Sequence, residues 1–195
     1  MFILVSSIVV RVTKKQKAKN CREIANFYIN NYTFVLELNE KRERKAIMKT
    51  AIVYHSHHHD NTKKLLDAIS ENDKVTLIKA SDSQHIDLSD YDIIGFASGI
   101  YYQKFHDAVL KSAENNLPPG KKVFFIYTCG RNVNTYTNAI RKIADAKCAQ
   151  VLGVYSCPGF DTFGPFKLVG GIAKGRPNEG DIDGAVKFFK EISKK

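Results

Sequence analysis

Residues 50–69 read TAIVYHSHHHDNTKKLLDAI, a short apolar run followed by a polar loop and an amphipathic segment. The opening TAIVYH is rich in β-branched and aromatic residues, which is typical of a buried strand. Within residues 61–71, the apolar side chains of Leu65, Leu66 and Ile69 fall on one face of a helix. The stretch therefore predicts a strand, a loop and a helix in immediate succession.

The same alternation continues to the end of the chain. Further strands are predicted at 74–80, 92–98, 122–128 and 150–156, and further helices at about 104–116, 135–147 and 181–194. The strand candidates are continuous apolar runs, which is typical of strands covered on both faces. Because parallel neighbours need crossover connections, the chain predicts a three-layer α/β/α sandwich around a five-stranded parallel sheet.

Residues 1–47 differ from the rest in charge and pattern. They hold ten Lys or Arg and four Glu, so +6 of the net charge of +10 lies there. We interpret 1–47 as a basic N-terminal extension, either an upstream-translated or misassigned start or a surface-binding arm, and 48–195 as the folded domain. Since this domain is only mildly basic, no nucleic-acid partner is predicted.

The cysteines Cys21, Cys129, Cys148 and Cys157 lack the short spacing of a metal or disulfide motif. We expect reduced thiols in a cytoplasmic protein. Cys129 and Cys157 could be redox-active, but small buried hydrophobic residues are the favoured interpretation. No run approaches the roughly 20 apolar residues of a membrane-spanning helix, so no membrane span is predicted.

The loop after the first strand is the first place to look for a ligand, because parallel sheets bind ligands beyond their carboxyl edge. Ser56, Asn61 and Thr62 supply hydroxyl and amide groups beside a helix N-terminus, where free N–H groups and the helix dipole attract anions. Lys63 or Lys64 could add charge. The alternative is that Asp60 or Asn61 simply caps the helix.

Three stretches resemble the flavodoxin family. YHSHHHDNTKKLLDAI (54–69) is similar to its phosphate loop and first helix, YDIIGFASGIYYQKFH (91–106) to its third strand and flavin-ring loop, and KKVFFIYTCG (121–130) to its fourth strand and following loop. The resemblance extends from Met48 to Lys195. It implies the strand order 2-1-3-4-5 and bound flavin mononucleotide (FMN).

The resemblance also implies which residues contact FMN. The phosphate would be held by Ser56, His57, His58, His59, Asn61 and Thr62. The isoalloxazine would lie against Ser98, Gly99, Ile100, Tyr101 and Tyr102, and the ring or ribityl chain would meet Thr128, Cys129 and Gly130. The family has Gly where this chain has Asp60. Aspartate tolerates a positive φ, but it brings a carboxylate close to the phosphate.

The three consecutive histidines also raise a metal hypothesis. Neighbouring residues of an extended loop point in different directions, and no second cluster of ligands completes a tetrahedral site. We therefore predict no metal.

The segment 157–180 contains nine of the chain's seventeen Gly and Pro residues, and a loop this long is usually functional or mobile. Phe160, Phe163 and Phe166 could cover the flavin or merely anchor the loop to the sheet. The basic side chains that could face an acidic partner are Lys167, Lys174 and Arg176.

Three functions remain open from the sequence. The leading hypothesis is an FMN-dependent electron carrier between a reductase and an acceptor protein. The second is an enzyme that passes hydride from a nicotinamide cofactor through FMN to a quinone or another small acceptor. The third is a binding module that has lost the flavin.

Overall fold

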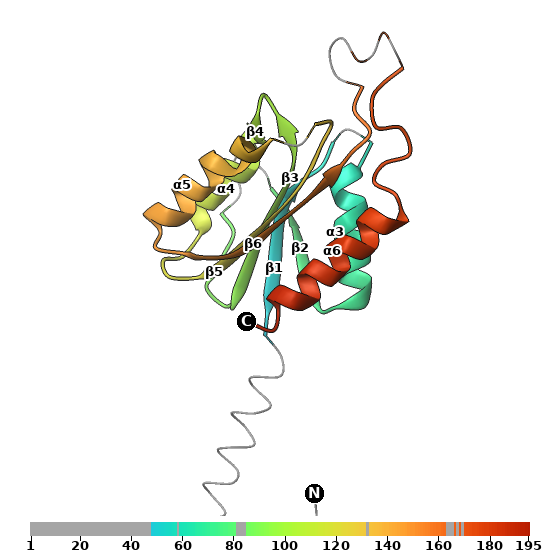
Figure 1. Cartoon of the computed structure of the whole chain (residues 1–195). Coiled ribbons are helices and arrows are strands. Elements are labelled where there is room, and N and C mark those ends of the chain that lie inside the picture. Colours follow the sequence, from blue (N-terminus) through green and yellow to red (C-terminus); the bar gives the residue numbers. More distant parts are fainter. Residues whose placement is uncertain are drawn as a thin grey trace, which may run out of the picture. The chain divides into compact units, whose positions relative to one another are not determined.

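The computed structural model describes residues 48–57, 59–80, 85–131, 133–162 and 170–195, together with Phe166 and Leu168. The proposed N-terminal extension therefore lies outside the described residues. Residues 48–195 form one compact unit, which Figure 1 shows as a sheet between two layers of helices.

The sheet has five parallel strands in the order β2-β1-β3-β5-β6. Their bounds are β1 Thr50–His55, β2 Val75–Lys79, β3 Ile93–Tyr101, β5 Lys122–Cys129 and β6 Gln150–Pro158. A sixth strand, β4 (Lys104–Phe105), pairs antiparallel with the end of β3. The predicted parallel sheet and its strand order are confirmed, with β4 as an addition.

Helices cover both faces of the sheet. On one face lie α3 (Asn61–Asn72) and α6 (Glu179–Ile192), and on the other α4 (Asp107–Asn116) and α5 (Asn138–Ala146) (Figure 1). A short 3₁₀ helix, η1 (Asn134–Thr137), leads into α5. Within the described part of the chain, no helix combines the length and apolar character needed to cross a membrane.

The apolar core is divided by the sheet into two clusters, because successive side chains of a strand point to opposite faces. Ile52 and Ile126 pack with Leu65 of α3 on one side. Val53 and Phe125 pack with Val109 of α4 on the other. All of these side chains are fully buried, so both helix layers are held by dense apolar contact.

The helix predicted at 104–116 begins later than expected. Tyr102 and Gln103 both have positive φ values, 49° and 65°, and form the two-residue turn that joins β3 to β4. The helix begins after His106, whose imidazole Nδ1 accepts a hydrogen bond from the Ala108 N–H at 3.2 Å. Tyr-Gln is not one of the usual hairpin dipeptides, so this turn has no local sequence signal.

Candidate functional site

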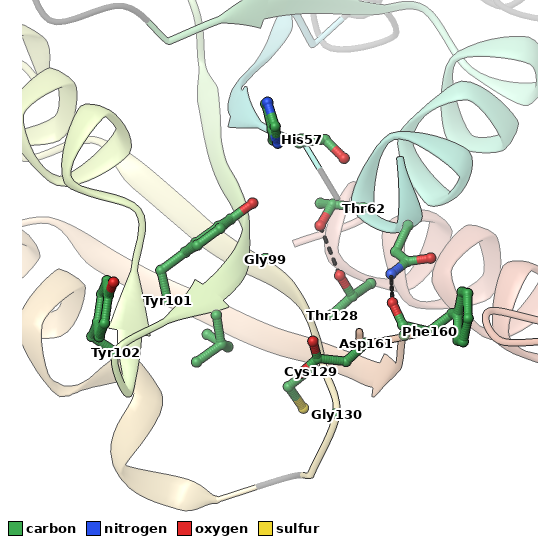
Figure 2. Close-up of a pocket in the computed structure, with 14 residues that line it drawn as sticks. His57, Thr62, Gly99, Tyr101, Tyr102, Thr128, Cys129, Gly130, Phe160 and Asp161 are labelled. Carbon is green, nitrogen blue, oxygen red and sulfur yellow. Dashed lines mark hydrogen bonds between the residues drawn. The ribbon is translucent and has the colours of Figure 1, made fainter. Parts of the chain in front are cut away.

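A cavity of about 260 Å³ lies at the carboxyl edge of the sheet, where β1, β3, β5 and β6 end. The sheet changes winding direction between β1 and β3, which is where parallel sheets bind ligands. Figure 2 shows Tyr101 and Tyr102 on one side of the cavity and Phe160 on the other. The lining residues are Ser56, His57, Asn61, Thr62, Gly99, Ile100, Tyr101, Tyr102, Thr128, Cys129, Gly130, Gly159, Phe160 and Asp161.

Eleven of the fourteen residues predicted from the sequence are in this lining. Of the other three, His58 lies outside the described residues. Ser98 is fully buried and does not line the cavity, and its hydroxyl donates to the Gly99 carbonyl and accepts from the His106 N–H. His59 turns aside: its Nε2 is 3.1 Å from the Thr162 hydroxyl, and its ring lies 4.4 Å from that of Phe160.

The N-terminus of α3 borders the cavity, and its N-cap residue provides no side-chain cap. Asp60 occupies the N-cap position in the left-handed conformation, with φ 49°, and its carboxylate makes no capping hydrogen bond. Asn61 uses its amide to donate to the Phe160 carbonyl at 2.8 Å. The alternative in which either residue simply caps the helix is therefore wrong. A helix N-terminus whose N-cap side chain makes no hydrogen bond to the first turn suits an anionic ligand.

Two hydroxyl groups join this helix end to its surroundings. The Thr62 hydroxyl is 2.9 Å from that of Thr128 at the end of β5, and both residues are buried. The Ser56 hydroxyl accepts from the Lys63 N–H at 3.3 Å. These contacts fix the loop after β1 against the neighbouring strand ends.

Lys63 and Lys64, the two lysines that follow the loop, supply little free positive charge for an anion in the cavity. The Lys63 ammonium contacts the Asp67 carboxylate at 2.7 Å, and this hydrogen bond is the main reason that the pKa of Lys63 is raised. Lys64 is exposed one position further along α3. The anion-binding capacity of this end of the cavity therefore depends on backbone N–H and hydroxyl donors.

The aromatic side of the cavity is formed by the end of β3 and the turn after it. The Tyr101 ring folds over Gly99, where an added Cβ would lie 3.3 Å from Tyr101 Cε2. Tyr102 is 83% exposed at the tip of the turn. One tyrosine is thus packed into the wall, and the other stands at the mouth.

Cys129 and Cys157 are buried free thiols. Burial raises the pKa of Cys129 to about 11 and that of Cys157 to about 12, with smaller contributions from nearby acidic groups. Both are therefore protonated at neutral pH, which favours the interpretation as small buried hydrophobic residues over redox-active thiols.

Three residues line the cavity in addition to those predicted as binding residues: Gly159, Phe160 and Asp161, of which only Phe160 is a candidate flavin cover from the sequence. The Gly159 N–H donates to the Cys129 carbonyl at 3.0 Å, which places this segment beside the end of β5. An added Cβ on Gly130 would lie 3.0 Å from Asp161 Oδ2, so the Asp161 side chain borders the same loop. Their place in the sequence could have identified them, because residues 159–161 follow the fifth predicted strand and so lie at the edge of the sheet where ligands bind.

The rest of the long loop is described only in part. Phe163 and Lys167, which entered the hypotheses of a flavin cover and an acidic partner, lie outside the described residues. Lys174 is exposed, but the Arg176 guanidinium contacts the Asp181 carboxylate of α6 at 2.6 Å. Arg176 therefore anchors the return of the loop to the domain.

The described residues contain no group of three or more His, Cys, Asp or Glu side chains placed to hold a metal ion. Among the histidines of the loop, His57 lines the cavity and His59 contacts the segment after β6.

Comparison with known proteins places this architecture in a family. A family model described as "Flavodoxin domain" matches residues 51–152. The uncharacterized protein MJ0298 of Methanocaldococcus jannaschii is 35% identical over 149 residues, which are 75% of this chain and 99% of that protein.

Two solved structures show the same fold. Oxidised flavodoxin 2 from Bacillus cereus matches with a TM-score of 0.56 and 17% identity, over 75% of this chain and 98% of that one. An NADPH-quinone reductase from P. pentosaceus matches with a TM-score of 0.52 and 11% identity, over 75% and 98% of the two chains.

Proposed function

Because this chain belongs to the flavodoxin family, whose cofactor is FMN, we propose that it is an electron-transfer protein that accepts electrons from a reductase and passes them to an acceptor protein. The proposed location is the cytoplasm, where thiols such as Cys129 and Cys157 remain reduced.

The cavity suits FMN at its phosphate end. The N-cap residue of α3, Asp60, makes no side-chain cap, and the hydroxyl groups of Ser56 and Thr62 line the cavity beside the first turn. Hydroxyl and backbone N–H groups match the acceptor oxygens of a phosphate without requiring a lysine. These residues would hold the phosphate and so fix the depth at which the cofactor lies.

The opposite end of the cavity suits a flat, largely apolar ring system. Tyr101 and Tyr102 line one side, and Phe160 lines the side formed by the loop after β6. Aromatic walls of this kind bury a ring by stacking and exclude water from it. When bound, FMN supplies the redox chemistry, and the polarity of the surrounding side chains sets its potential.

The observation that carries the proposal is that one cavity joins the N-terminus of α3 and the Ser56 and Thr62 hydroxyl groups to an aromatic wall. The test is to incubate the purified protein with FMN, desalt it, and record the visible absorbance spectrum. We expect flavin bands that survive desalting at about one FMN per chain. A colourless protein, with all FMN in the filtrate, would instead support the binding module that has lost its flavin.

A second function is favoured by the wall that Gly159, Phe160 and Asp161 add to the cavity. This wall could enclose a small substrate beside the flavin, as needed by an NAD(P)H-dependent quinone or flavin reductase. Steady-state NAD(P)H oxidation with a quinone, in the absence of any partner protein, separates the two functions. Turnover under these conditions would overturn the carrier proposal, whereas electron relay to a cytochrome only after a reductase is added would support it.

Replacement of Asp60 tests how the departure from the family pattern affects binding. Asp60→Asn removes a negative charge beside the phosphate end and should tighten FMN binding about tenfold, the effect of a partly screened charge interaction of about 1.4 kcal/mol. Asp60→Gly should give the same gain in affinity and also raise the free energy of unfolding by about 1 kcal/mol, because φ is 49° there.

Comparing Asp60→Asn with Asp60→Gly separates the effect of the carboxylate charge on FMN affinity from the effect of backbone strain on stability. Affinity is measured by quenching of FMN fluorescence, and stability by urea denaturation of the FMN-free protein. An Asn variant that binds FMN no more tightly than the parent would show that the carboxylate does not act on the phosphate.

A further inference from the structure

Asn61, the first residue of α3, is predicted from the sequence as a phosphate ligand, but its amide bonds to the protein itself. Its Nδ2 donates to the Phe160 carbonyl at 2.8 Å, across a separation of 99 positions (Figure 2, dashed line at Phe160). Asn61 lines the cavity and is only 7% exposed. The hydrogen bond therefore joins the phosphate end of the cavity to the loop after β6.

The orientation of the Asn61 amide follows from its surroundings. Turned the other way, the amide would set Oδ1 against the Phe160 carbonyl oxygen, and two acceptors repel each other. In the observed orientation, Oδ1 is buried and has no hydrogen-bond partner among the described residues. Since an unpaired buried acceptor lowers stability, the reason for an asparagine at this position is not its contribution to stability. What the side chain provides is a donor to the loop after β6.

The backbone of Gly159 leaves room for this hydrogen bond. A Cβ added to Gly159 would lie 2.9 Å from Asn61 Nδ2 and 3.2 Å from Asn61 Cβ, so the amide packs directly on the glycine. The Gly159 N–H donates to the Cys129 carbonyl at 3.0 Å, which fixes the same segment to the end of β5. The loop after β6 thus meets α3 and β5 within two consecutive residues.

Other contacts hold this segment from both sides. In the loop after β1, His59 Nε2 lies 3.1 Å from the Thr162 hydroxyl, and the His59 ring centroid is 4.4 Å from that of Phe160. On the other side, the Phe160 N–H donates to the Arg176 carbonyl at 3.0 Å. Both the N–H and the carbonyl of Phe160 are therefore bonded to other segments, and Asn61 supplies the bond that comes from the cavity lining.

We propose that Asn61 is a positioning residue for flavin binding, which holds the loop after β6 in place as a wall of the cavity and does not serve as a phosphate ligand. This inference rests on the proposed function. The wall consists of Gly159, Phe160 and Asp161. Because it is part of the cavity whether or not the ligand carries a phosphate, its displacement weakens FMN and riboflavin alike. Riboflavin is FMN without the phosphate group.

The first test measures the FMN-free protein by NMR. Asn61→Ala should raise the hydrogen-exchange rates of the Phe160 and Asp161 N–H groups about fivefold, the factor equivalent to one hydrogen bond of about 1 kcal/mol. The Phe160 ¹³C carbonyl resonance should shift as well, because this carbonyl loses its donor. The control Asn72→Ala, at an exposed α3 asparagine that donates to the Ala68 carbonyl, should change neither.

Two outcomes of this NMR test would overturn the inference. The first is parental exchange of the Phe160 and Asp161 N–H groups in Asn61→Ala. The second is faster exchange without a shift of the Phe160 carbonyl resonance, which would indicate general destabilisation of the domain. Neither outcome depends on whether the protein binds flavin.

The second test compares the dissociation constants of FMN and riboflavin, measured by quenching of flavin fluorescence. Asn61→Ala should weaken both ligands about fivefold, because the wall serves both. Ser56→Ala removes a hydroxyl proposed to hold the phosphate, so it should weaken FMN about fivefold more than riboflavin. A loss in Asn61→Ala that is confined to FMN would identify Asn61 as a phosphate ligand and overturn the inference.

The variant Asn61→Asp distinguishes hydrogen bonding from packing. Aspartate has nearly the shape of asparagine, but its carboxylate cannot donate to the Phe160 carbonyl. Riboflavin affinity should therefore fall in Asn61→Asp by at least the factor found in Asn61→Ala, and FMN affinity should fall further because the carboxylate lies beside the phosphate. Parental riboflavin affinity in Asn61→Asp would show that Asn61 acts by packing alone and would overturn the inference.

The two tests also separate this inference from the proposed function. A parent protein that binds neither flavin would contradict the proposed function. The exchange rates and the Phe160 carbonyl resonance of the FMN-free protein would still decide whether Asn61 holds the loop after β6.

Discussion

Gly159→Val is expected to weaken FMN binding by about 100-fold while the domain remains folded. An added Cβ at this position would lie 2.9 Å from Asn61 Nδ2 and 3.1 Å from Thr128 Cβ, which is too close on both sides. The valine would push the segment after β6 away from the N-terminus of α3 and break the Asn61 hydrogen bond to the Phe160 carbonyl. A 100-fold loss corresponds to about 2.8 kcal/mol of binding free energy, because each tenfold change in affinity is about 1.4 kcal/mol.

Fluorescence quenching measures the loss of affinity, and the urea midpoint of the FMN-free protein checks that the fold survives. Gly180→Ala is the control, because its Cβ would meet only Asn178 Oδ1 at 3.5 Å. Parental FMN affinity in Gly159→Val would show that the contact between the two loops does not shape the cavity.

Gly95→Ala is expected to lower the free energy of unfolding by about 3 kcal/mol, at the upper end of the usual cost of overpacking a core. Gly95 lies in the middle of β3, and an added Cβ would be 2.4 Å from Cζ of Phe124 and 3.0 Å from Cγ1 of Ile52. Phe124 is fully buried on the neighbouring strand, so its ring has no open space to enter.

A double-mutant cycle tests this explanation. Phe124→Leu removes the ring atoms that the new methyl group would strike, so Gly95→Ala should cost about 1 kcal/mol in that background. Urea denaturation of the parent, the two single variants and the double variant gives the coupling free energy between Gly95→Ala and Phe124→Leu. If the losses of unfolding free energy in the two single variants simply add, the clash with the Phe124 ring is not the cause of the destabilisation.

The centre of the sheet was predictable from the sequence because β1, β3 and β5 are largely buried and are written as apolar runs. The predicted strand at 122–128 agrees with β5 to within one residue, and the strand at 50–55 has the bounds of β1. The turn between β3 and β4 was harder to predict from the sequence. Tyr102 and Gln103 adopt positive φ without glycine or asparagine, so β4 could not be anticipated.

The candidate site was predictable where binding residues directly follow strands, as with Thr128, Cys129 and Gly130. It was not predictable where tertiary contacts redirect a side chain. His59 belongs to the loop after β1, yet it packs on Phe160, about a hundred positions away in sequence. The lining by Gly159 and Asp161 likewise depends on how the loop after β6 returns over the sheet, which no local pattern encodes.

The division of the core by the sheet has an evolutionary consequence. The phosphate end of the cavity is carried by α3, which packs through Leu65 and Leu66 into one cluster. The ring end is carried by the β3–α4 connection, which packs through Phe105 and Val109 into the other. Substitutions that accumulate behind the ring are separated by the sheet from those that support the phosphate. Natural selection can therefore change the residues around the ring, and with them the redox potential, while the residues that bind the phosphate stay the same.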